Sequence, residues 1–336
     1  MNSKAVLVTG GAGYIGSHAC KALYQRGFLP ITVDNLTNGH REAVQWGPLY
    51  VANIDDKSTI QAIIEKYKIT SVLHFAGSID ISAGEKSPTT LFYNNVIATL
   101  ALLETIVTHN IKHVVFSSTC AVYGIPNHIP IDEKTICNPI NSYGESKLFI
   151  EKVLARYQRS YNLQSVALRY FNAAGADADG QIGELHQHET HLIPVAIEAA
   201  LTNKPFTIFG NDYNTPDGTA IRDYIHVTDL AEAHVAALEY LLLGGNSCHL
   251  NLGSGQGHSV REVIHAIERL TQKKLIIKEE ARRPGDAPCL IANPQQAQRA
   301  LAWKTRHSTL TKIIHTALRW HQNPNFLPND VPEKTS

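Results

Sequence analysis

The chain has 336 residues, in which 30 lysine and arginine residues balance 30 aspartate and glutamate residues. This length suits two packed lobes, and the balanced charge gives no electrostatic argument for binding nucleic acid or a membrane surface. Five scattered cysteines without a C-x-x-C pair, no leader segment and no apolar run of membrane-spanning length predict a soluble cytoplasmic protein without a disulfide framework or a zinc site.

A glycine-rich turn follows the first predicted strand. Residues 5–9 (AVLVT) are apolar and β-branched, and GGAGYIG leads from them into a helical pattern, with Gly10, Gly13 and Gly16 in G-x-x-G-x-x-G spacing. Glycines there allow a tight turn and let backbone N–H groups approach a pyrophosphate at a helix N-terminus. The strand before and the helix after, more than the glycines alone, predict a dinucleotide site.

The second predicted strand ends at Asp34, 18 residues after Gly16. A carboxylate at this place accepts a hydrogen bond from the adenosine ribose of a bound dinucleotide. It would repel a 2′-phosphate, and Asn35 rather than an arginine follows it, so we predict NAD and not NADP. The alternative is that Asp34 is only a turn residue at the end of a strand.

Strands and helices then alternate along the chain. We predict strands at residues 49–54, 71–77, 113–119 and 165–172, the last closing the series, and helices at 57–68, 90–110 and 143–159. Repeated βα units predict a parallel, doubly wound sheet with ligands at the carboxyl ends of its strands. Five small or polar clusters fall at such ends: Gly10, Asp34, Phe75–Gly77, Ser117–Thr119 and Phe171–Asn172.

The segment NSYGESK (141–147) opens the last of these helices and places Tyr143 and Lys147 four residues apart, on one helix face. Ionising a tyrosine near neutral pH requires its pKa to fall by about three units, or roughly 4 kcal/mol, and a neighbouring ammonium lowers it. We therefore predict a general base and its activating cation. The alternative is an ordinary surface pair, because Y-x-x-x-K is common by chance.

Eight motifs occur in a fixed order: GGAGYIGSH, VDNLTNG, HFAG, FYNN, FSSTCAVYG, the Y-x-x-x-K helix, LRYFN and RDYIHVTD. Together they resemble the extended short-chain dehydrogenase/reductases and, among these, the UDP-glucose 4-epimerases, over residues 4–320. We expect an α/β fold with a Rossmann-type NAD-binding domain at 1–175. A smaller α/β lobe at 176–321 would mainly bind the nucleotide sugar, with some segments packing back on the first domain. A flexible tail would follow at 322–336.

The resemblance implies an NAD-dependent isomerase. Tyr143 would take the proton from O4 of the sugar while hydride passes from C4 to NAD, and Lys147 would bind the nicotinamide ribose and hold the tyrosine pKa down. Thr119 would hydrogen-bond the same O4, although it is also explained as a strand-end threonine. The 4-keto intermediate would turn and take the hydride back on its other face, so UDP-galactose and UDP-glucose interconvert. The family also implies a homodimer through the helices at 90–109 and 143–159.

The resemblance further assigns two sets of binding residues. NAD would contact Gly10, Gly13, Tyr14, Ile15, Gly16, Asp34, Asn35, Leu36, Thr37, Asn38, Asn53, Ile54, Phe75, Ala76, Gly77, Asn95, Tyr143, Lys147 and Phe171. The UDP-sugar would contact Thr119, Tyr143, Asn172, His191, Leu192, Arg222, Arg283, Asp286 and Leu290. Two departures stand out: Asn53 replaces the usual aspartate beside the adenine, and the loop at 78–88 diverges.

Arg222 and Leu290 bear on the choice of substrate. The forked guanidinium of Arg222 suits a diphosphate; the alternative is a surface ion pair with Asp223 or Asp229. Leu290 aligns where the family has a tyrosine or a cysteine beside the C2 substituent of the sugar. Because leucine is intermediate in size, a 4-epimerase of UDP-N-acetylhexosamine, UDP-pentose or UDP-uronic acid remains an alternative.

Three other interpretations are disfavoured. A dehydratase would have an acidic pair where this chain has Cys120 and Ala121. A non-catalytic NAD-sensing protein would usually lack the tyrosine or the lysine. His186, His188 and His191 suggest a metal site, but the sequence shows no carboxylate or cysteine set at matching spacing, and the chemistry needs no metal, so we predict none.

Overall fold

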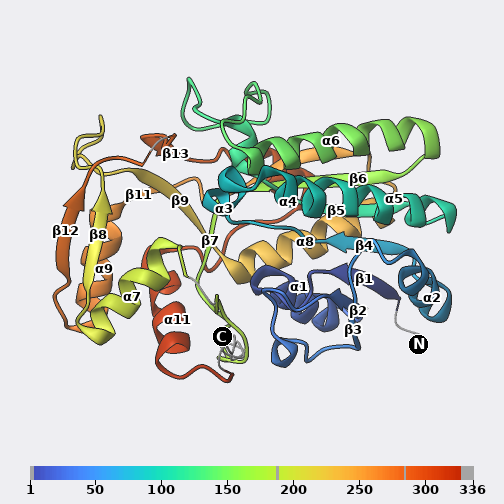
Figure 1. Cartoon of the computed structure of the whole chain (residues 1–336), viewed down its shortest axis with the longest axis horizontal. Helices are drawn as coiled ribbons and strands as arrows, with labels where there is room; N and C mark the ends of the chain where they lie inside the picture. The colour runs from blue at the N-terminus through green and yellow to red at the C-terminus, as the bar shows by residue number, and fades with distance from the viewer. Residues whose placement is uncertain (1–3, 187–188, 284, 327–336) are drawn as a thin grey trace, which may run out of the picture.

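The computed structural model describes residues 4–186, 189–283 and 285–326. His188 and the last part of the predicted tail, 327–336, lie outside these ranges. A large sheet with helices on both faces occupies one side of the molecule, and a smaller lobe occupies the other (Figure 1). The main-sheet strands are β1 (Ala5–Thr9), β2 (Leu29–Asp34), β3 (Leu49–Val51), β4 (Ser71–His74), β5 (His113–Thr119), β6 (Gln164–Tyr170) and β10 (Cys248–Leu252).

The seven strands of this sheet are all parallel and lie in the order β10-β6-β5-β4-β1-β2-β3. The chain winds outward from β1 in one direction to β3 and then in the other from β4, so the strand order reverses between β1 and β4. Such a switch point creates a crevice at the carboxyl ends of the strands. The predicted doubly wound, Rossmann-type fold is confirmed.

Strand β10 corrects one prediction, because the series of strands does not close at residues 165–172. The five residues of β10 pair in register with β6, from Cys248 beside Val166 to Leu252 beside Tyr170. Leu250 and Leu252 are fully buried there. A helix precedes β10, but the strand before that helix belongs to the smaller lobe, so only tertiary packing reveals that β10 belongs to the main sheet.

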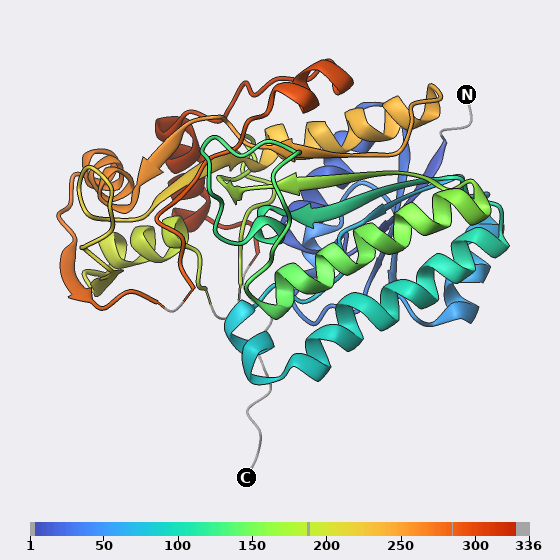
Figure 2. The ribbon, with the colours of Figure 1, turned by 90° about the horizontal axis from the view of Figure 1, so that it is seen from above.

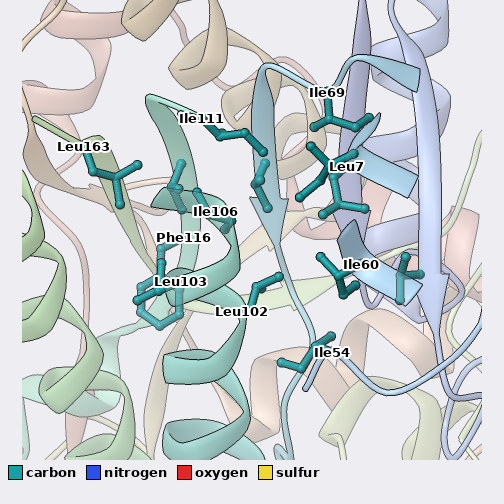
Figure 3. Close-up of a cluster of buried hydrophobic side chains, with 14 of the residues drawn as sticks. Leu7, Ile54, Ile60, Ile69, Leu102, Leu103, Ile106, Ile111, Phe116 and Leu163 are labelled. Atoms are coloured by element: carbon teal, nitrogen blue, oxygen red, sulfur yellow. The ribbon is translucent and has the colours of Figure 1, made fainter. Parts of the chain in front are cut away.

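Alternating side chains of the strands bury two separate cores. Leu7 packs with residues of α2 (Lys57–Tyr67), α5 (Ala98–Thr108) and α6 (Ser142–Tyr161), among them Ile60 and Ile106, as Figure 3 shows. Val6 and Val8 point to the other face and pack with α1 (Tyr14–Gln25), α8 (Val227–Leu242) and α10 (Gln295–Leu301). Period-two alternation of this kind is what a sheet covered on both faces requires.

The helix predicted at 90–110 is continuous but has three parts: α4 (Pro88–Phe92), a π-helical turn (Tyr93–Ile97) and α5. Among the described residues, the span Pro88–Thr108 is long and apolar enough to cross a membrane by length and composition alone. This contradicts the expectation that no apolar run reaches that length. Half of its most apolar window is buried inside the protein, where α5 contributes Leu102 and Leu103 to the core, as a core helix does.

The smaller lobe combines short strands with three helices. Strand β9 (Ile221–His226) pairs with β7 (Asn172–Ala174), β11 (Gly257–Ser259) and β13 (Cys289–Leu290), and β8 (Pro205–Phe209) pairs with β12 (Ile276–Glu280). Its helices are α7 (Leu192–Thr202), α9 (Val260–Thr271) and α11 (Leu310–Gln322). The described ranges also hold three short helical segments: η1 (Arg41–Ala43), α3 (Ile81–Lys86) and η3 (Cys120–Tyr123).

Candidate functional site

A cavity of about 740 Å³ lies where the main sheet faces the smaller lobe. In Figure 2 the arrows of β5 and β6 point toward that lobe, and residues at the carboxyl ends of these strands line the cavity. All five strand-end clusters predicted from the sequence contribute to its wall. Of the residues predicted to bind NAD or the sugar, all line the cavity except Leu36, Asn95 and Leu192.

The glycine turn is shaped by two close backbone contacts. Gly10 has a φ of +72°, and a Cβ there would lie 2.6 Å from the backbone nitrogen of Ala76. A Cβ on Gly16 would lie 2.1 Å from the carbonyl oxygen of Gly10. Helix α1 starts directly after this turn, and no side chain caps its N-terminus. Its first-turn N–H groups are therefore available to an anion such as a pyrophosphate.

Asp34 ends β2 and is held by the turn it faces. Its Oδ2 accepts from the backbone N–H of Ala12 at 3.0 Å and its Oδ1 from that of Leu36 at 2.9 Å. Burial raises the pKa of this carboxyl, and the two hydrogen bonds oppose the rise. The Asn35 side chain donates to Asn53 Oδ1 at 2.9 Å, which ties the ends of β2 and β3 together. An anion-binding turn beside a fixed carboxylate fits a dinucleotide.

Asn95 has a different position from the one expected of a cofactor ligand. Only 3% of it is exposed, and its side chain accepts from Ser78 N at 2.6 Å and donates to Ser78 O at 3.0 Å. It also donates to Ser146 Oγ at 3.1 Å. Asn95 therefore fixes the loop after β4 against helix α6 and shapes the cavity from behind its wall.

Tyr143, Lys147 and Thr119 meet in the cavity. The side chain of Asn141 caps helix α6 by accepting from Gly144 N at 2.8 Å, which places Tyr143 in the first turn. The Lys147 ammonium lies 5.8 Å from the Tyr143 ring centre and donates to Ser117 O at 3.0 Å. Thr119 is buried at the end of β5. The predicted base, cation and hydroxyl are thus brought together.

The pKa values correct one part of that prediction. Burial raises the pKa of Tyr143 above its ordinary value of 10.0, with Tyr170 adding to the rise and Thr119 opposing it. Burial also lowers the pKa of Lys147 to about 8. In the protein alone, burial outweighs any lowering by Lys147, so the tyrosine pKa is raised and not held down.

Arg222 lies on β9 and lines the same cavity. Its Nη1 donates to Ile221 O at 2.9 Å and to Ala287 O at 2.8 Å, and its Nη2 lies 3.5 Å from Asp286 Oδ1. In the parallel ladder with β13 its partner is Leu290, which also lines the cavity. These contacts hold the guanidinium at the wall.

The alternative ion pairs of Arg222 are not formed. Asp223 is buried and accepts from Ser254, Gly255 and Ala292. Asp229 is also buried, and accepts from residues of the 306–308 turn. Both carboxylates fasten loops of the smaller lobe and are unavailable to the arginine.

Two carboxylates were missed, of which Glu184 lines the cavity. Glu184 and Glu189 lie beside His186 and His191, with one ligand-type atom from each of the four within 4.8 Å of the others. The prediction that no carboxylate set lies at matching spacing was wrong, because Glu184, His186, Glu189 and His191 alternate within eight residues. That spacing was the available signal.

Comparison with known proteins places these features in context. Residues 6–253 match the model of the NAD dependent epimerase/dehydratase family. The UDP-glucose 4-epimerase of Rhizobium leguminosarum bv. trifolii is 48% identical over 326 residues, which cover 97% of this chain and 99% of that protein.

Solved structures are similarly close. The UDP-glucose 4-epimerase from Brucella ovis in complex with NAD superposes with a TM-score of 0.92 at 46% identity, covering 94% of this chain and 98% of that one. The UDP-Glc/GlcNAc 4-epimerase from Campylobacter jejuni superposes with a TM-score of 0.83 at 35% identity, covering 95% and 99%. The similarity therefore extends over both lobes and the cavity between them.

Proposed function

Because this chain belongs to the NAD-dependent epimerase/dehydratase family, we propose that it is an isomerase that interconverts UDP-galactose and UDP-glucose at C4. One observation carries the proposal. A single cavity joins the glycine turn and Asp34 at one end to Tyr143, Thr119 and Arg222 at the other. A dinucleotide and a nucleotide sugar can therefore lie in the same space, with the reacting carbon beside a proton acceptor.

The residues that would bind NAD lie at the carboxyl edge of the main sheet. The glycine turn and the first turn of α1 would receive the pyrophosphate, Asp34 the adenosine ribose and Lys147 the nicotinamide ribose. Bound NAD supplies the acceptor for hydride from C4 and, in its oxidised form, a positive charge. The Asn35–Asn53 hydrogen bond fixes the rim that would face the adenine.

Tyr143 is proposed to take the proton of the sugar 4-hydroxyl and to return it at the end of the cycle. Burial raises the pKa of the free protein's tyrosine, so the phenolate depends on positive charge nearby, of which Lys147 at 5.8 Å is one source. Thr119 would hold the same oxygen by a hydrogen bond. The oxidised sugar then presents its other face, and reversal of the same steps yields the epimer.

Binding of the substrate diphosphate is assigned to Arg222 and Arg283, which line the cavity on segments of the smaller lobe. Arg222 is the better fixed of the two, through the carbonyl oxygens of Ile221 and Ala287. Asp286 would accept from the uridine ribose. Because the hydride and the proton both return to the sugar, the cycle consumes no cofactor.

Leu290 supports a second candidate substrate. It lines the cavity beside Arg222, and leucine leaves more room than tyrosine would. A related protein, the UDP-Glc/GlcNAc 4-epimerase of Campylobacter jejuni, is 35% identical to this chain. We therefore include UDP-N-acetylhexosamines as alternative substrates.

We also propose a cytoplasmic homodimer formed by the helices α5 and α6. These helices lie side by side on one face of the sheet (Figures 1 and 2). Ile97 at the start of α5 and Phe149 on α6 are large apolar side chains that are 51% and 48% exposed. Exposed apolar surface of this kind favours contact with another protein chain. Sedimentation of the wild type and of Phe149→Glu tests this, and a monomeric wild type contradicts it.

The function is tested on purified protein without added cofactor. UDP-galactose is supplied, formation of UDP-glucose is followed with a coupling dehydrogenase, and nucleotide released by denaturation is measured. We expect turnover and about one NAD per chain. Turnover only on UDP-N-acetylgalactosamine would favour the second candidate. Bound NAD without turnover on either sugar would contradict both.

A further inference from the structure

We propose that Glu184, His186, Glu189 and His191 form a binding site for a divalent transition-metal ion of the zinc class. The four side chains come from the segment between β7 and α7, and their ligand-type atoms lie within 4.8 Å of one another. Glu184, His186 and His191 also line the cavity, so the site opens on it. Of the four, only His191 has a proposed role in the epimerisation, a contact with the UDP-sugar; Glu184, His186 and Glu189 have none.

The measured separations suit a small ion. His186 Nδ1 lies 3.5 Å from Glu184 Oε1 and 3.1 Å from Glu189 Oε2, and His191 Nδ1 lies 3.4 Å from Glu189 Oε1. Ligands about 2.1 Å from a tetrahedral zinc ion are about 3.4 Å apart. The fourth separation, His191 Nδ1 to Glu184 Oε1, is 2.5 Å and would lengthen on metal binding. Both imidazoles present the same nitrogen, Nδ1, to the same two carboxylates.

Charge balance favours exchange of protons for a metal. Two carboxylates close to each other need two positive charges, which two protonated imidazoles or one divalent cation can provide. Two imidazolium rings repel each other, and here their centres are 5.5 Å apart. A divalent ion between the rings removes that repulsion and keeps the group neutral. Imidazole and carboxylate together are the ligands of many zinc sites.

The backbone at Glu184 and Leu185 is anchored by two hydrogen bonds, which position the first ligand before an ion arrives. Trp320 Nε1 donates to Glu184 O at 2.9 Å, and a ring nitrogen of His40 lies 2.8 Å from Leu185 O. His191 is the N-cap residue of α7. The Glu184 side chain is only 4% exposed, whereas that of His191 is 46% exposed. An ion could therefore enter from the cavity at the accessible His191 imidazole and reach the buried Glu184 carboxylate behind it.

The experiment measures metal binding and needs no turnover. Untagged protein is stripped with a chelator and titrated with Zn²⁺ alone against a chromophoric chelator. We expect one ion per chain, bound with release of protons as the imidazoles give them up. The double variant Glu184→Gln/His186→Asn should lose about 100-fold or more in zinc affinity, since two of four ligands are removed.

A matched control comes from another His–Glu pair. His109 Nε2 lies 3.7 Å from Glu65 Oε1, and the His109 side chain is 19% exposed, as is that of His186. Glu65→Gln/His109→Asn should leave zinc affinity unchanged. Glu189→Gln alone, with its thermal unfolding checked, guards against a folding defect in the double variant. Equal zinc binding by the wild type and the Glu184→Gln/His186→Asn protein, or none by either, would overturn the site.

Discussion

Two buried cations, Arg169 and Lys147, lie close together in this molecule, but within the described ranges only Arg169 is paired with a carboxylate. Arg169 on β6 donates from Nε to Glu151 at 2.9 Å and from Nη2 to the same carboxylate at 2.5 Å, and the pair raises the pKa of the arginine. Lys147 lies one turn before Glu151 on α6, is equally buried and donates to the carbonyl oxygen of Ser117. Its pKa is lowered to about 8 by burial.

The difference separates a structural charge from one that we propose to be functional. The Arg169–Glu151 pair satisfies both partners, so neither is available to a ligand, and it joins the last helix of the cofactor half to the sheet. Among the described residues, Lys147 has no carboxylate in hydrogen-bond contact, so its charge remains directed to whatever fills the cavity. Sites of function often keep such unfavourable groups at a cost in stability.

The largest expected effect lies on the functional side of this comparison. Tyr143→Phe removes the proposed proton acceptor but keeps the ring, so we expect about a 10³-fold loss of turnover, the usual size of a general-base contribution. Folding and retained NAD should be unchanged. Tyr161→Phe, at the exposed end of the same helix, is the control and should keep full activity. Near-normal turnover by Tyr143→Phe would exclude the tyrosine as the base.

The next largest effect is expected at the structural ion pair between Arg169 and Glu151. Glu151→Gln leaves the Arg169 guanidinium buried without its counter-charge, and we expect the free energy of unfolding to fall by about 3–5 kcal/mol. Denaturant titration measures it. The control is Glu104→Gln, which breaks the exposed Lys57–Glu104 pair of 2.6 Å and should cost less than about 1 kcal/mol. Equal losses in the two variants would remove the distinction between buried and exposed pairs.

A smaller effect of opposite sign is expected at Lys147. The fall of its pKa from 10.5 to about 8 corresponds to about 3 kcal/mol of destabilisation. Lys147→Met removes this penalty but leaves Ser117 O without its donor, which costs about 1 kcal/mol. We expect a net gain of about 2 kcal/mol in stability at pH 7, together with a loss of activity.

The pH dependence of that gain has a definite direction. The folded protein binds the lysine proton more weakly than the unfolded chain, so the penalty is complete below pH 8, the folded pKa. Above pH 8 the folded protein has lost the proton, and the penalty then falls with rising pH until it vanishes near 10.5, where the unfolded chain loses its proton too. The advantage of Lys147→Met should thus shrink to zero at about pH 10 and change sign above it, where only the lost hydrogen bond of about 1 kcal/mol remains. A constant difference across this range would show that packing, not charge, is responsible.

The cofactor half was largely predictable from the sequence. The glycine turn, Asp34 and the Tyr143–Lys147 spacing are local patterns, and the alternation of strands and helices fixes the edge of the sheet where they meet. The same reasoning failed for the charges, because pKa values depend on burial in the finished cavity. Sequence spacing brings Lys147 close to Tyr143 but does not show what solvation both groups lose.

The smaller lobe was much less predictable. Strand β10 joins the main sheet from residue 248 onward, and Asp223, adjacent to Arg222 in sequence, turns away to fasten Ser254. Neither follows from a local period, because both depend on contacts between distant segments. The carboxylates near His186 were visible in the sequence, but no regular element marked them as neighbours.

Leu290 offers the smallest effect and the sharpest test of substrate choice. It pairs with Arg222 across β13 and β9 and lies at the cavity wall. Leu290→Tyr would fill space near the sugar without touching Tyr143 or Lys147, so we expect little change with UDP-galactose. Activity on UDP-N-acetylgalactosamine should fall about 10-fold, the usual discrimination from a modest change in pocket volume. An equal fall on both sugars would place Leu290 away from the C2 substituent. Because Leu290→Tyr changes no charge, either outcome would report the volume of the cavity alone.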